Sequence, residues 1–256
     1  MSGTTVRTEA IVLRSIRYGE ADRILHLYSR DRGRIGAIAK GARKPKSRFG
    51  GRLEPFFRLD LMLHEGRGDL MTVTGVTTVD GYPRLRSNGA AIGAGARACD
   101  AVLRLLDAAE PNPPAYNLLC RYLELLDAPA ADRSPLVAQT ETSGERTSNA
   151  SLERALSFRL KLALAAGFAP ELASCASCGE AEHLSGFSGA AGGVVCGSCE
   201  AGSFPFSEGA HAFMVEALAL PLSEAPAADP AALRQVERAV GETLEHHAHV
   251  QLRAAA

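Results

Sequence analysis

The chain has 256 residues, with no tryptophan, few other aromatic residues and only four lysines. No apolar run approaches the roughly 18 residues that a membrane-spanning helix needs. The first residues, MSGTTVRTEA, lack the apolar segment of a secretory signal. Without such a signal the six cysteines are expected to stay reduced. We therefore expect a cytoplasmic protein that makes no contact with a membrane.

Common catalytic signatures are also missing. There is no HExxH, GxSxG or glycine-rich dinucleotide motif. Gly36 and Gly41 have the spacing of a phosphate-binding loop, but the Lys-Ser/Thr pair that must follow is absent. Glu20 and Asp22 form the closest acidic pair to the basic region, and a nuclease could use two carboxylates with Mg²⁺. The sequence thus favours a protein that is not an enzyme, with a metal-dependent nuclease as an alternative.

Positive charge is concentrated near the N-terminus. The whole chain has 28 basic and 29 acidic residues, yet residues 1–86 hold 17 basic and 9 acidic ones. Between Arg30 and Arg52 there are nine basic residues and one acid, Asp31. Neighbouring glycine and proline residues break helices and strands, so this charge is expected on a loop. A cationic loop on an otherwise acidic protein predicts a polyanionic partner, most commonly a nucleic-acid backbone.

The residues of this stretch expected to contact DNA are cations that bind phosphates and one aromatic ring that could stack on a base: Arg34, Lys40, Arg43, Lys44, Lys46, Arg48, Arg52 and Phe49. Phe49 is preferred over the aromatic residues nearby, which are Tyr18, Tyr28, Phe56 and Phe57. Phe57 belongs to an alternating strand, so it is expected in the core. The alternative is that the basic run is a solvated loop that only improves solubility.

The first part of the chain reads as β-structure. Runs of β-forming or alternating residues predict five strands at about 9–16, 24–29, 34–40, 57–64 and 70–80. Five short strands within ninety residues indicate a small closed or half-closed barrel, and an OB-type barrel fits the strand count. We therefore predict an OB-fold domain over residues 1–82.

After Pro83 the sequence becomes helical. Helices are expected at about 88–109, with Asn88 as N-cap, and at 115–127, 152–166, 207–220 and 230–252. Ser151 is expected to cap the third of them. Residues 128–150 are rich in Ser, Thr, Pro and Ala and predict a flexible connection. The fold class is therefore α+β, with the barrel followed by a helical domain over residues 83–256.

Two CxxC pairs lie in this second domain. Cys175 and Cys178 form the first pair, and Cys196 and Cys199 form the second, 17 residues later. Each pair brings two sulfurs to one edge of a tetrahedral site, and the linker suffices for a hairpin. We predict one structural Zn²⁺ in a ribbon at about residues 172–204, since four thiolates leave no open position for catalysis. His183, between the pairs, is expected to be exposed and not a ligand.

The quoted segments together resemble the RecO family of bacterial recombination mediators. The resemblance is carried by the stretch from Ala10 to Phe56, by LALAAGFAPELASCASCG and by VVCGSC, which follow in the same order along the chain. Lys40-Gly41-Ala42-Arg43 and the segment from Ala166 to Pro170 are its most specific parts. The middle, from about Arg86 to Ala150, matches weakly.

The resemblance implies a non-enzymatic DNA-repair factor with an N-terminal OB fold and a helical domain. Members of this family bind single- and double-stranded DNA and anneal complementary strands. They act with RecR and sometimes RecF to load RecA onto gaps coated by single-strand-binding protein, whose tail is a further possible partner. A zinc-ribbon adaptor that binds proteins and no DNA remains the second alternative.

Overall fold

A computed structural model describes residues 4–66, 68–106, 109–129 and 143–255. The chain divides after Ala128 into two compact units, residues 1–128 and 129–256, each with its own core. None of the described helices is long and apolar enough to cross a membrane.

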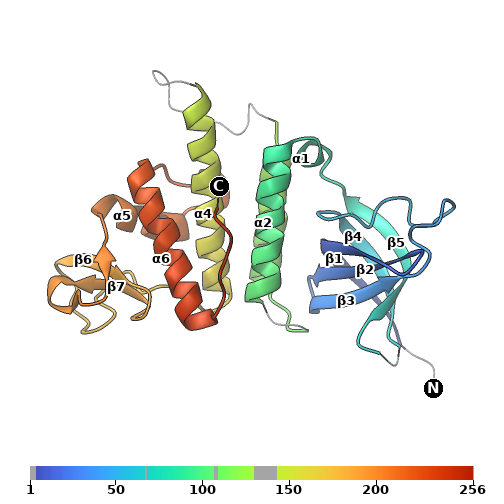
Figure 1. The fold of residues 1–256 in the computed structure, drawn as a ribbon, viewed down its shortest axis with the longest axis horizontal. Coiled ribbons are helices and arrows are strands. Elements are labelled where there is room, and N and C mark those ends of the chain that lie inside the picture. The colour runs from blue at the N-terminus through green and yellow to red at the C-terminus, as the bar shows by residue number, and fades with distance from the viewer. Residues whose placement is uncertain (1–3, 67, 107–108, 130–142, 256) are drawn as a thin grey trace. The chain divides into compact units, whose positions relative to one another are not determined.

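The first unit is built on a closed barrel (Figure 1). Its order is β1-β2-β3-β5-β4, and the strands pair antiparallel except for the parallel pair of β3 and β5. The strands are β1 (Thr5–Tyr18), β2 (Asp22–Ser29), β3 (Gly33–Ala39), β4 (Arg58–His64) and β5 (Met71–Asp80). This closed five-stranded barrel confirms the predicted β-module and is consistent with an OB fold.

Alternating residues of the strands fill the barrel. Leu25 and Leu27 of β2 and Leu59, Leu61 and Leu63 of β4 are fully buried in one hydrophobic cluster. Complete burial of a leucine side chain is worth about 1.5–3 kcal/mol. The period-2 pattern in the sequence therefore marks the side chains that stabilise the barrel.

A β-bulge changes the direction of the side chains along β1. Val12 lies opposite Leu27 in the core, whereas Arg14 lies opposite His26, with the register shifting between them. The extra residue turns Arg14 and the alternate residues after it to the outer face. The second half of β1 therefore presents side chains to solvent that simple alternation would place in the core.

Three helices complete the first unit: α1 (Pro83–Arg86), α2 (Gly89–Leu105) and α3 (Pro113–Asp127). Asn88 caps α2 as predicted, because its side chain accepts a hydrogen bond from the Ala91 amide at 3.1 Å. The helices pack on the barrel partly through Tyr116 of α3, whose ring centroid is 6.1 Å from that of Tyr28 and whose hydroxyl donates to Glu9. The change from strand to helix near residue 82 thus falls inside one compact unit.

The second unit contains α4 (Ser143–Ala165), α5 (Glu208–Ala219) and α6 (Pro230–Ala248), with short 3₁₀ turns at Gly197–Cys199 and Leu222–Glu224. Its three-stranded sheet has the order β7-β6-β8, made of β6 (Leu184–Ser188), β7 (Gly193–Cys196) and β8 (Phe204–Pro205). The helix α4 begins at Ser143, so the predicted cap at Ser151 is wrong and the last residues of the expected linker are helical. The rest of that linker, residues 130–142, lies outside the described residues.

Replacing Phe49, which is buried in the barrel cluster, should destabilise the first unit. Phe49→Ala is expected to lower the free energy of unfolding by about 3–5 kcal/mol, because it leaves a cavity among the strand residues. Urea unfolding followed by circular dichroism measures the loss, and Phe49→Leu should lose less because it retains more of the buried volume. An unchanged midpoint for Phe49→Ala would contradict the burial.

Gly33 and Gly51 form a matched pair for testing the contact between β3 and the segment before α3. Both have positive φ, 63° and 76°, so alanine is strained at either position. A Cβ on Gly33 would also lie 2.2 Å from the Glu110 carbonyl oxygen, whereas one on Gly51 meets nothing within 4 Å. Gly33→Ala should therefore lower the thermal midpoint clearly more than Gly51→Ala. Equal decreases in the thermal midpoint of the two variants would show that the close contact with the Glu110 backbone does not require glycine at position 33.

Candidate nucleic-acid interface and metal centre

The basic loop between β3 and β4 is bonded to the turn between β1 and β2. The Gly41 amide donates to the Asp22 carboxylate at 2.7 Å, and the Arg43 amide donates to the Ala21 carbonyl at 2.8 Å. The Arg43 guanidinium also donates to the Gly19 carbonyl at 3.2 Å. Asp22, half of the acidic pair considered for a nuclease, thus accepts a hydrogen bond from the loop backbone.

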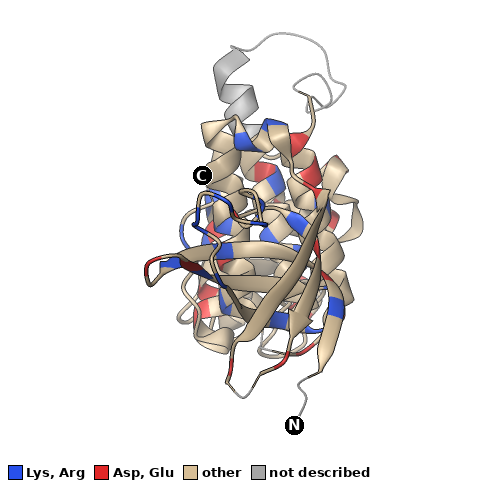
Figure 2. Cartoon of the chain, turned by 90° about the vertical axis from the view of Figure 1, so that its right-hand side faces the viewer, with Lys and Arg blue, Asp and Glu red and all other residues tan. Residues whose placement is uncertain are grey.

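Three lysines on this loop are exposed and unneutralised. The Lys44 amide donates to the Gly41 carbonyl at 3.1 Å and the Ser47 amide to the Lys44 carbonyl at 2.9 Å, so the backbone here forms tight turns. The side chains of Lys40, Lys44 and Lys46 are exposed. Among the described residues, no carboxylate lies within 4 Å of any of the three ammonium groups. Figure 2, which looks onto the barrel, colours basic residues blue and acidic residues red; the loop itself, residues 40–57, contains one acidic residue, Glu54.

Two arginines of the loop reach back to β5. Arg48 donates to the Val73 carbonyl and Arg52 to the Val76 carbonyl, both at 3.3 Å. The Arg48 guanidinium also lies 5.0 Å from the Phe49 ring centroid. These arginines therefore fasten the loop to the barrel while keeping their charge at its surface.

Arg34 stands apart from this surface. It lies on β3, is half-buried, and donates to the Leu103 carbonyl of α2 at 2.5 Å. Its guanidinium therefore joins the barrel to a helix. The proposed interface therefore does not include Arg34.

The prediction that Phe49 stacks on a base is wrong. Its side chain is only 2% exposed and belongs to the barrel core together with Leu53. Tyr28 and Phe56 are buried as well, and Phe57 is half-buried against the same core, as its alternating strand predicted. Of the five aromatic residues considered near the basic run, Tyr18 is the exposed one, at 54%.

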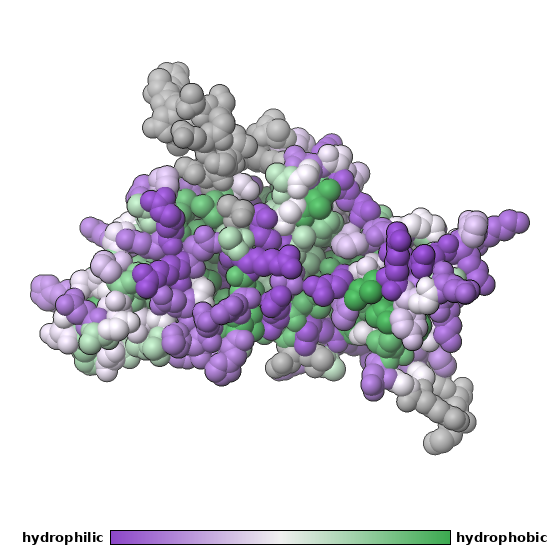
Figure 3. Space-filling view, viewed as in Figure 1, coloured by the Kyte–Doolittle hydropathy of each residue, from purple (hydrophilic) through white to green (hydrophobic). Residues whose placement is uncertain are grey.

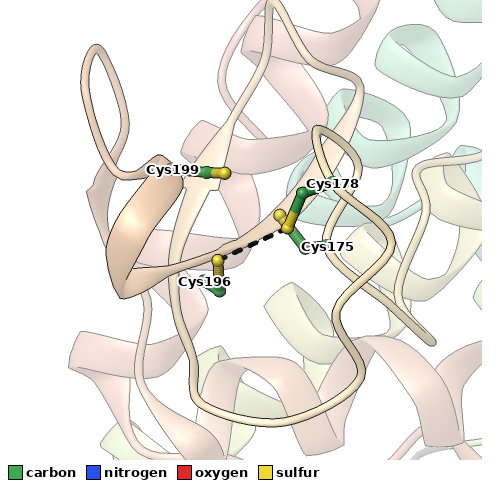
Figure 4. A group of neighbouring side chains, drawn as sticks. All are labelled: Cys175, Cys178, Cys196 and Cys199. Carbon is green, nitrogen blue, oxygen red and sulfur yellow. Dashed lines mark hydrogen bonds between the residues drawn. The ribbon is translucent and has the colours of Figure 1, made fainter.

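The four cysteines of the second unit converge on one point (Figure 4). The sulfur atoms of Cys175, Cys178, Cys196 and Cys199 all lie within 4.8 Å of one another, and Cys178 Sγ is 3.7 Å from Cys196 Sγ. A tetrahedron with metal–sulfur bonds of about 2.3 Å has edges of roughly 3.8 Å. The arrangement therefore fits a metal ion held by four thiolates.

The electrostatics of the cluster also suit a cation. Hydrogen bonds from backbone groups, chiefly that of Cys196, lower the pKa of Cys175 to about 6. Hydrogen bonds with the Cys178 and Cys196 side chains raise the pKa of Cys199 to about 12. The cluster thus holds one thiolate readily and resists further negative charge. A bound divalent cation would stabilise the remaining thiols in their deprotonated form, because the thiolate is the form that binds a metal.

The cysteine module is built as predicted and is attached to the helices of its unit. The two knuckles are joined by the hairpin of β6 and β7. His211 of α5 bonds the Leu172 carbonyl at 2.8 Å, and His247 of α6 bonds the Gly189 carbonyl at 2.9 Å. His183 is exposed, as expected, and does not belong to the cluster. The histidines that sequence reasoning passed over therefore position the module.

Comparison with known proteins identifies the family. Residues 1–82 match the family model for the recombination protein O N-terminal region, and residues 145–255 match that for its C-terminal region. A DNA repair protein RecO from Rubrobacter xylanophilus is 39% identical over 241 residues, covering 91% of this chain and 89% of the relative. One from Anaeromyxobacter dehalogenans is 33% identical over 252 residues, covering 94% and 91%. The chain therefore belongs to the RecO family of DNA repair and recombination proteins.

Proposed function

We propose that this protein binds single- and double-stranded DNA through the basic loop of its barrel. The observation that carries the proposal is the set of three exposed lysines, Lys40, Lys44 and Lys46, with no carboxylate partner among the described residues. Arg43, Arg48 and Arg52 add charge beside them. Such contacts gain free energy by releasing counterions from DNA and carry no sequence information.

We further propose that the protein pairs complementary strands without ATP. Annealing requires that the repulsion between two phosphate backbones be reduced while the bases remain available. A fixed cationic loop on a barrel meets the first requirement, and the sequence contains no nucleotide-hydrolysing loop. A strand-pairing assay with purified protein tests this, and a requirement for ATP, or cleavage of the strands, would contradict it.

The proposed protein partners follow from the family and from the charge distribution. We propose that the protein acts at the nucleoid in the cytoplasm with RecR, and with RecF or the tail of single-strand-binding protein, to help load RecA on gapped DNA. The chain after residue 86 holds 11 basic and 20 acidic residues, a balance that disfavours phosphate contacts. That part of the chain is therefore better suited to contacts with proteins than to contacts with DNA.

We propose that the four-cysteine centre holds one structural Zn²⁺. Four sulfurs with tetrahedral spacing are a ligand set typical of structural zinc, which supplies folding free energy and no open coordination position. The ligands come from two knuckles joined by a short hairpin, so the metal would hold together a module with little core of its own.

Protein purified without added metal should therefore contain one zinc per chain. Cys178→Ser is expected to lower the zinc content strongly and to make the segment 172–204 more susceptible to protease, because one of four ligands is lost. Elemental analysis and limited proteolysis measure both effects. Cys120→Ala, a buried cysteine of α3 outside the cluster, is the control and should retain full zinc. Four free thiols and substoichiometric zinc in the unaltered protein would overturn the assignment.

Removing two loop lysines should reduce the salt dependence of DNA binding. If Lys44 and Lys46 each contact a phosphate, their joint replacement by Ala should lower the slope of log affinity against log salt by about 1.4 for single strands and about 1.8 for duplex. Fluorescence anisotropy with labelled oligonucleotides at several NaCl concentrations measures the slopes. The loss should be similar for unrelated sequences.

The matched control removes the same charge elsewhere in the first unit. Arg104 of α2 and Arg121 of α3 are exposed and lie beside Asp100 and Glu124 of their own helices. Their joint replacement by Ala should leave the slopes unchanged. Wild-type slopes in the Lys44/Lys46 variant, or equal losses in both variants, would reject the loop as the main contact.

A further inference from the structure

The outer face of β1, β2 and β3 carries a row of three isoleucines. The bulge after Val12 turns Ile16 outward, where it lies opposite Ile24 of β2, and Ile24 in turn lies opposite Ile38 of β3. Directly opposed side chains on one face of a sheet are close neighbours. The three side chains and Tyr18, two residues beyond Ile16 on the same face, form one continuous apolar strip, which we call the isoleucine row.

This row is open to solvent. Ile16 is 42% exposed and Tyr18 54%, while Ile24 and Ile38 are half-buried. Figure 3 shows hydrophobic side chains gathered over β1, β2 and β3, with hydrophilic ones around them. Within the described part of the chain, no ring or hydrogen-bond partner contacts the Tyr18 side chain. A contiguous apolar strip at the surface of a soluble unit is typical of a binding site.

The basic loop lies directly beside one end of the row. Tyr18 pairs with Asp22 across the turn, and the Asp22 carboxylate accepts the amide of Gly41. The carbonyl oxygen of Gly19, the residue after Tyr18, accepts a hydrogen bond from the guanidinium of Arg43. Tyr18 is therefore next to the two residues, Gly19 and Asp22, that accept hydrogen bonds from the basic loop.

At the other end of the row the positive charge of Arg14 is paired with the Asp100 carboxylate of α2, 3.3 Å away. Arg14 follows the bulge on the same face as Ile16, and His26 lies opposite it on β2. Burial, together with the positive charges of Arg14 and Arg34, lowers the pKa of His26. The flat apolar strip is thus bounded by the basic loop at one end and by a paired arginine and an imidazole that favours its neutral form at the other. The cations at the loop end complement a ligand that carries flat apolar groups on an anionic chain.

We propose that the isoleucine row is where unpaired bases of single-stranded DNA lie, with Tyr18 stacking on one base while the loop lysines bind the backbone. This inference rests on the DNA binding proposed above and specifies which residues meet the bases. In a duplex the bases are stacked and paired inside the helix, so the row can serve single strands only. Contacts with the isoleucine row should therefore contribute to the affinity for single strands and not to the affinity for duplex DNA.

Tyr18→Ala should weaken binding to a labelled oligo-dT by about 5- to 150-fold, the range for losing one stacked base. Its salt slope should stay that of the unaltered protein, because no phosphate contact is lost. Binding to a duplex of equal length should change by less than about 2-fold, well below the loss of one stacked base. Tyr18→Phe should retain the single-strand affinity, since the ring is kept. Fluorescence anisotropy at a fixed NaCl concentration, repeated across a salt series, gives all four results.

Met62→Ala is the matched control. Met62 is an exposed apolar residue of the same barrel, 39% exposed, but it lies on β4 outside the row. Its replacement should leave both affinities unchanged. Thermal unfolding of each variant checks that Tyr18→Ala keeps the fold, as expected for a ring that is 54% exposed.

The outcomes separate this inference from the proposed function. If the unaltered protein binds DNA with a steep salt slope but Tyr18→Ala binds single strands equally well, the base surface is wrong and the loop proposal stands. An equal loss for single strands and duplex would also overturn the inference, because it would mean that Tyr18 supports the loop. No binding by the unaltered protein would overturn both proposals.

A second copy of this chain is the competing occupant of the row. In that case Ile24→Ser should turn a dimer into a monomer in analytical ultracentrifugation and leave single-strand affinity unchanged. That result would overturn the inference. A monomer before and after the change, with weaker binding of single strands by Ile24→Ser, would support it.

Discussion

The burial of Phe49 in the barrel core is the constraint on which the proposed interface depends. Phe49 and Leu53 are buried members of the barrel cluster, 2% and 3% exposed, although they belong to the loop between β3 and β4. A loop of this length with six basic residues would otherwise be extended by its own repulsion. Burying its middle in the core, and bonding its start to the turn between β1 and β2, holds the lysines in fixed positions.

Holding the cations in place has an electrostatic consequence. Elsewhere in the first unit, Arg7, Arg23 and Arg32 each lie within 4 Å of a carboxylate. The loop lysines have no such partner among the described residues, so their mutual repulsion persists in the free protein. Phosphates bound as proposed would relieve that repulsion, and they would require little further ordering of the loop because its turns are already formed. The free energy of binding is therefore not reduced by a cost of ordering the loop.

The sequence predicted the features that depend on local periodicity and spacing. It did not predict the positions of side chains that depend on the tertiary structure. Alternation located the barrel strands, and the paired CxxC motifs located the four-cysteine cluster. Phe49 stands in an irregular basic stretch without periodicity, so nothing local reveals that it fills the barrel. Tyr18 was considered but ranked behind Phe49, which lies inside the basic run, and alternation along β1 does not reveal the bulge near Leu13 that turns Tyr18 outward. The early start of α4 was missed because Ser, Thr and Asn have modest helix propensity, so the local sequence there gives no helix signal.

The two units arrange their titratable groups in opposite ways, and the arrangement in the second unit supports a structural role for the proposed metal. The barrel keeps its cations apart and exposed, whereas the second unit brings four thiols within 4.8 Å, where a second thiolate is resisted. The surrounding contacts do not remove that resistance: His211 and His247 bond backbone carbonyls outside the cluster. They fasten the module to α5 and α6 whether or not a cation is bound. Loss of the proposed metal should therefore loosen the two knuckles while the sheet stays attached to its helices, a local change that leaves the basic loop of the other unit unaltered.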